Sequence, residues 1–170
     1  MGSLPDRWAA VQERIGRATA RAGSDPAGVR VVAVTKTRSP AEIDAALALG
    51  LDWLGENRVD EAAAKMPQVR PGAAWHLIGQ LQTNKAGRAA ELFAVVQSVD
   101  RPRLVAALER RAGLAQRRLD VLVQVNTSAA SQQGGVAPDA AEALVAEVAA
   151  QPHLRLCGLM TIGALSQDER

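Results

Sequence analysis

The sequence predicts an α/β fold in which βα units repeat around a parallel sheet, wound as one continuous unit. From Val31 onward, short runs rich in β-branched residues alternate with amphipathic stretches rich in alanine and leucine, which is the order expected of βα units. Most of these runs are too apolar to alternate between polar and apolar residues. We therefore expect both faces of the sheet to be buried.

The predicted strands are Val31–Thr35, Asp52–Gly55, Trp75–Gly79, Ala94–Ser98, Asp120–Asn126 and Leu154–Met160. Helices are predicted between them, and the first interval carries the clearest signals. Ser39 is the expected N-cap, Pro40 the first helical residue, Glu42 the capping-box partner and Gly50 the stop. Further helices are predicted over residues 5–21, 58–66, 84–92, 102–117 and 138–151.

The composition predicts a single globular domain over residues 1–170, long enough to bury a core without disulfide or metal support. The 20 basic and 18 acidic side chains are mixed along the chain, and three tryptophans and one phenylalanine form no stacking series. A nucleic-acid partner is therefore not expected. No metal-ligand spacing links His76, His153 and Cys157, so we expect no metal.

The location and assembly of the protein are predicted from what its sequence lacks. Cys157 is its only cysteine, its first residues have neither the cationic start nor the apolar core of a signal peptide, and no apolar run approaches the roughly 20 residues of a spanning helix. We expect a cytoplasmic monomer without a membrane partner.

Polar or small residues follow every predicted strand. They are Thr35-Lys36, Glu56-Asn57, Gly79-Gln80, Val99-Asp100, Asn126-Thr127 and Met160-Thr161. Barrels and open parallel sheets both bind ligands at the carboxyl ends of their strands. A shared pocket would explain the pattern, although strands also end in polar loops for ordinary reasons.

Lys36 is the most reactive candidate among these residues. It directly follows the apolar run Val31–Thr35, so we expect partial desolvation that favours a neutral amine able to form an imine with an aldehyde. The alternatives are a side chain that extends to solvent or a point charge that binds an anion. Position alone does not decide between them.

Five ordered segments resemble the pyridoxal phosphate homeostasis protein family. They are VVAVTKT (31–37), GENRVDEA (55–62), WHLIGQLQTNK (75–85), VLVQVNTS (121–128) and LRLCGLMTI (154–162). The resemblance implies a (β/α)8 TIM-type barrel like the N-terminal domain of alanine racemase, with about six of its eight strands in this chain. It also implies that Lys36 carries pyridoxal 5'-phosphate as a Schiff base. The implied role is vitamin B6 homeostasis and cofactor delivery to apo enzymes, without turnover.

Four further residues are candidate cofactor contacts. Asn57 could instead cap the next helix, His76 could be a core or supporting group, and Met160 could simply fill the barrel. Asn126 ends the fifth predicted strand and could donate or accept a hydrogen bond in the pocket. We assign no catalytic residue.

A Schiff-base enzyme, racemase-like or aldolase-like, is the main alternative function, and a regulatory module for a protein or RNA partner is the other. Alanine racemase uses a tyrosine as one of its two bases, and this sequence contains no tyrosine. Without two opposed bases, we do not expect racemisation. The resemblance also implies a Ser-Met-Gly-Met-Ser segment and an Arg-x-Gly segment, so we expect the chain to continue beyond Arg170 and the phosphate-binding residues to lie there.

Overall fold

The structure, a computed structural model, describes residues 2–128 and 132–163 and confirms the predicted α/β class. Its strands are β1 (Ala33–Val34), β2 (Trp53–Glu56), β3 (Ala74–Leu77), β4 (Val95–Val99), β5 (Leu119–Gln124) and β6 (Leu154–Met160). They form one sheet in sequence order, and each strand pairs in parallel with its neighbour. β1 has two residues, fewer than the predicted Val31–Thr35, and it pairs with β2 alone.

The helices are α1 (Leu4–Ala22), α2 (Pro40–Ala48), α3 (Val59–Lys65), α4 (Ala86–Leu92), α5 (Pro102–Leu114) and α6 (Ala141–Ala149). The predicted capping box of α2 is present, because the Glu42 N–H donates to Ser39 Oγ and the Glu42 carboxylate accepts the Ser39 N–H. The last helix starts later than predicted because Pro138–Ala140 forms a separate 3-10 turn, η4.

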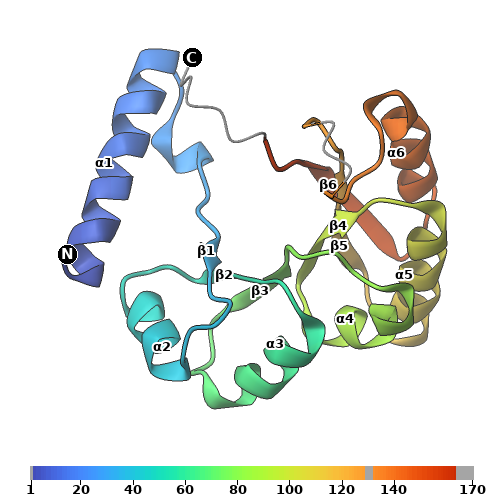
Figure 1. The fold of residues 1–170 in the computed structure, drawn as a ribbon, viewed down its shortest axis with the longest axis horizontal. Coiled ribbons are helices and arrows are strands. Elements are labelled where there is room, and N and C mark those ends of the chain that lie inside the picture. Colours follow the sequence, from blue (N-terminus) through green and yellow to red (C-terminus); the bar gives the residue numbers. More distant parts are fainter. Residues whose placement is uncertain (1, 129–131, 164–170) are drawn as a thin grey trace.

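The sheet curves like part of a barrel wall. Figure 1 shows helices α2 to α6 following one another along the outer side of the strands, while α1 stands at the end of the series next to β1. β1 and β6 are the two edges of the described sheet. Each exposes an apolar side chain, because Val34 is 51% exposed and Leu159 is 63% exposed.

Leu54 of β2 packs with Ile43 and Leu47 of α2 in a smaller core cluster. Alternate residues of β3 to β6 face the helices and form the main core. Leu77 and Val96 of the sheet pack there with Phe93 and with Leu108 of α5. The residues between them face the concave side, where His76 accepts a hydrogen bond from Gln97. The core therefore fixes the orientation of each strand, including the direction in which its carboxyl end points.

The effect of burial on stability can be compared for two leucines of one helix. Leu108 of α5 is fully buried, whereas Leu114 on the same helix is 73% exposed. We expect Leu108→Ala to lower the free energy of unfolding by about 2–5 kcal/mol, through lost burial and a residual cavity. Leu114→Ala should change it by no more than about 0.5 kcal/mol. Urea denaturation of both variants tests this, and equal costs would contradict the described core.

Candidate functional site

The parallel sheet places most of the predicted site residues at the carboxyl ends of its strands, which we call the carboxyl edge. Lys36 follows β1, Asn57 follows β2, Asn126 follows β5 and Met160 ends β6. His76 is different because it lies within β3, paired with Gly55 of β2 and Val95 of β4. The structure thus gathers four of the candidates at the carboxyl edge and places His76 inside the sheet.

Lys36 lies in a tight turn directly after β1. The Arg38 N–H donates to the Thr35 carbonyl at 3.0 Å, so Lys36 and Thr37 are the two central residues of the turn. Thr37 has φ 62°, a left-handed conformation that costs a β-branched residue on the order of 1–3 kcal/mol. The Lys36 side chain itself is exposed. The partial burial predicted from the sequence is therefore wrong for the described structure.

The sequence contains three lysines, and their surroundings differ. Lys65 is buried, and its ammonium donates to Glu56, to Glu61 and to the Thr35 carbonyl. Lys85 is ion-paired with Asp60 at 3.0 Å. Within residues 2–128 and 132–163, the Lys36 amine makes no hydrogen bond or ion pair. Lys36 is thus the lysine whose amine is available to a ligand.

Asn57 lines a polar cavity of about 940 Å³ at the carboxyl ends of β2, β3 and β4. Gly79 is packed tightly against the Asn57 backbone, since a Cβ at Gly79 would lie 2.2 Å from the Asn57 carbonyl oxygen. The cavity also contains charged groups of both signs, among them Arg58, Asp100 and Arg101. A side chain at position 79 would push the Asn57 backbone away, so the glycine fixes where Asn57 lies.

His76 is 2% exposed, and its ring packs against Trp53 with 4.8 Å between the centroids and an angle of 33° between the ring planes. The Gln97 amide donates to His76 Nδ1 at 2.8 Å, which leaves the proton of the neutral ring on Nε2. Nε2 is buried and finds no partner among the described residues. Burial lowers the pKa of His76, and the opposing effect of the Asp120 charge is smaller, so the folded protein favours the neutral ring.

Asn126 and Met160 both lie where β5 and β6 end. The Asn126 amide donates to the Gln133 carbonyl at 3.1 Å, and its oxygen accepts from Ser128, so this side chain also shapes the following loop. Met160 is half-buried and pairs with Gln124 of β5. Sequence reasoning missed Gln97 and the Lys65 cluster. Only the Glu61–Lys65 spacing of i, i+4 could have indicated part of that cluster.

Comparison with known proteins decides the family. The sequence-family model of the alanine racemase N-terminal domain matches residues 7–170. A pyridoxal phosphate homeostasis protein of Pseudomonas aeruginosa is 41% identical over 165 residues, which cover 95% of this chain and 71% of that protein. The chain belongs to the pyridoxal phosphate homeostasis protein family.

A second relative and a solved structure support the family and the fold. The pyridoxal phosphate homeostasis protein of Escherichia coli is 34% identical over 168 residues, covering 96% of this chain and 72% of that protein. PipY of Synechococcus elongatus, solved with PLP bound, is 34% identical with a TM-score of 0.77, and the match covers 89% of this chain and 71% of PipY. The predicted likeness to the alanine racemase N-terminal barrel is thereby confirmed.

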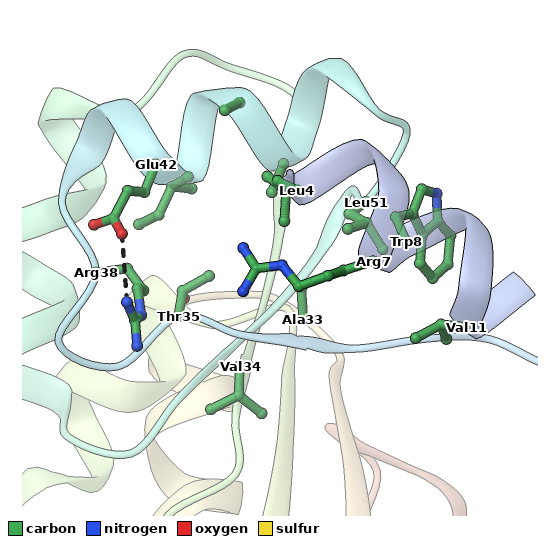
Figure 2. A pocket seen from close by; sticks show the side chains of 13 residues that line it. Leu4, Arg7, Trp8, Val11, Ala33, Val34, Thr35, Arg38, Glu42 and Leu51 are labelled. Carbon is green, nitrogen blue, oxygen red and sulfur yellow. Dashed lines mark hydrogen bonds and ion pairs between the residues drawn. The ribbon is translucent and has the colours of Figure 1, made fainter. Parts of the chain in front are cut away.

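A second cavity of this chain, of about 570 Å³, lies between α1, β1 and α2. Figure 2 shows Trp8, Val11 and Leu51 along it and the Arg38–Glu42 ion pair at its rim. The Thr35 hydroxyl that lines it donates to Glu56 at 2.7 Å. The groove is mostly apolar and offers no free nucleophile, so the carboxyl edge is the candidate site.

The described residues contain neither a cluster of three metal-ligating side chains nor a helix long and apolar enough to cross a membrane.

The lowered pKa of His76 predicts a dependence of stability on pH. The unfolded chain takes up a proton near the ordinary pKa of about 6.5, whereas the folded protein resists protonation until lower pH. The free energy of unfolding should therefore fall as the pH drops below 6.5, by at most about 1.4 kcal/mol per pH unit from this group. His76→Asn keeps an acceptor for Gln97 and should flatten the slope between pH 7.5 and 5.5. Unchanged slopes in urea titrations would contradict the assignment.

Proposed function

We propose that this protein binds pyridoxal phosphate (PLP) and holds it as a Schiff base on Lys36. The observation that carries the proposal is the state of the three lysines, since Lys65 and Lys85 are ion-paired and the exposed Lys36 amine lies at the carboxyl edge. The bound PLP of PipY and the names of the related homeostasis proteins support the choice of cofactor.

The residues at this edge fit the chemistry. When bound, PLP would supply an aldehyde, and the Lys36 amine would add to its carbon to form a new C–N bond. The aldehyde oxygen leaves as water with the two amine protons as the C=N bond forms. Because Lys36 is exposed, both the entry of the aldehyde and the reverse hydrolysis are open to solvent.

Asn57, His76, Asn126 and Met160 are the proposed further contacts. Asn57 lines the cavity at the carboxyl ends of β2, β3 and β4, and the lining of that cavity does not include Lys36. Met160 and Asn126 lie at the same edge through β5 and β6. His76 would act from within the sheet, where its buried Nε2 has no partner among the described residues.

The proposed role is intracellular vitamin B6 homeostasis, with delivery of PLP to apo enzymes in the cytoplasm and no turnover. The related proteins are named for homeostasis, and residues 1–170 contain no tyrosine that could act as a racemase base. Its single cysteine also suits a reducing compartment. The same lysine chemistry could serve a racemase or an aldolase, so conversion of alanine or threonine by the PLP-loaded protein would overturn the carrier role.

The Schiff base is tested with two variants of Lys36. The wild-type protein mixed with PLP should give a visible imine absorbance, and borohydride should fix the adduct on the peptide containing Lys36. Lys36→Ala should lose the band. Lys36→Arg keeps the positive charge but has no nucleophilic amine, so it separates imine formation from simple anion binding.

We expect Lys36→Arg to lose the band as well. A band of wild-type size in either variant, or a borohydride adduct mapped to another residue, would contradict the proposal.

A further inference from the structure

We propose that Lys65, with Glu56 and Glu61, is a positioning residue that fixes the Thr35–Thr37 turn and so presents the Lys36 amine. This inference rests on the proposed function, because it concerns the lysine that would form the Schiff base. It names residues of α3 and β2 that act through the backbone on either side of Lys36.

Thr35, the residue before Lys36, is held by two buried side chains. The Thr35 carbonyl accepts from the Lys65 ammonium at 2.9 Å, and the Thr35 hydroxyl donates to Glu56 Oε1 at 2.7 Å. The Lys65 ammonium donates to the same Glu56 oxygen at 2.7 Å. Thr35, Glu56 and Lys65 are all less than 9% exposed, so water does not compete strongly for these contacts.

The residue after Lys36 is held by the same cluster. The Thr37 N–H donates to Glu61 Oε1 at 2.8 Å, and Lys65 donates to that oxygen at 3.1 Å. Thr37 has φ 62°, a conformation at the third position of a turn that favours glycine or asparagine. A threonine remains there only when its surroundings hold it, and the Glu61 carboxylate adds a contact to the Arg38–Thr35 bond that closes the turn.

The side chains of the cluster are held together by opposite charges. Burial by itself would lower the pKa of Lys65, but its hydrogen bonds to Glu56 and Glu61 outweigh that effect and raise it. The Thr37 N–H and then Lys65 hold the pKa of Glu61 below its ordinary value. Both groups therefore stay ionised at neutral pH. Oxygen Oε2 of Glu56 has no partner among the described residues, so the contacts of this side chain to Thr35 and Lys65 both use Oε1.

The geometry separates backbone from side chain at Lys36. Its two neighbours are tied to a buried ion cluster, while its own amine stays exposed and without a partner among the described residues. A fixed backbone reduces the conformations that the lysine must lose on forming the imine, which favours binding. Lys65 itself is unsuited to the reaction because its ammonium is committed to three acceptors.

The main test uses Glu61→Ala, which removes the acceptor of the Thr37 N–H from the partly exposed side of α3. We expect the equilibrium constant for imine formation with PLP to fall about threefold to tenfold, the range for one hydrogen bond. Amide exchange in the peptide containing residues 35–38 should become faster, while the thermal midpoint stays close to the wild-type value. Glu61→Gln keeps an acceptor oxygen and should remain within about twofold of wild type.

Two further variants separate positioning from stability. Glu91→Ala is the matched control, because Glu91 also pairs with a basic residue of its own helix, Arg88, but on α4; it should change neither imine formation nor exchange at residues 35–38. The double variant Glu56→Leu/Lys65→Met replaces the buried pair by apolar groups, which often leaves a protein folded. It should fold and still form the imine more weakly than Glu61→Gln does.

The outcomes distinguish this inference from the proposed function. Faster exchange in Glu61→Ala with a wild-type imine constant would overturn the positioning role and leave the Schiff base on Lys36 intact. If the wild-type protein forms no adduct at Lys36, the proposed function fails. The hold on the turn is then judged by exchange alone, and an unchanged rate in Glu61→Ala would overturn it.

Discussion

The parallel pairing of each strand with its sequence neighbour is the constraint on which the site depends. Because β1 to β6 run in the same direction and in chain order, every segment that follows a strand emerges at one edge. The turn that follows β1, closed by the Arg38 N–H on the Thr35 carbonyl, then separates neighbouring residues by burial. Thr35 is buried against Glu56 and Lys65, while the next residue, Lys36, is exposed. One backbone thus anchors a reactive residue through its neighbour.

The buried ion pair at this anchor is better explained by geometry than by stability. Removing an ammonium and a carboxylate from water costs several kcal/mol per ion, and the attraction between them often does no more than offset that cost. Glu56 is fully buried and Lys65 nearly so. An apolar pair would fill the same space, but it could not form hydrogen bonds with the Thr35 carbonyl and the Thr35 hydroxyl. The polar contacts to the turn are what the charged pair adds.

The sequence predicted the elements well because their signals are local. The Ser39–Glu42 capping box and the apolar runs of the strands depend on residues only a few positions apart. The Gln97–His76 contact and the Glu56–Lys65 pair join different elements, so no local pattern contains them. Burial of Lys36 was wrongly predicted for the same reason. Exposure depends on which elements surround a strand end, and the described sheet leaves β1 at an edge.

The exposure of Lys36 also bears on the kind of protein that the fold can support. An enzyme that works through a lysine imine gains from excluding water, since water hydrolyses the reactive linkage. A carrier has the opposite requirement, because release needs water to reach the C=N bond. Under the proposed function, an exposed amine on a held turn would meet that requirement, because the backbone would stay ordered for capture while the bond remained open to hydrolysis. Under the proposed function, the held turn and the exposed amine would suit reversible holding of an aldehyde cofactor.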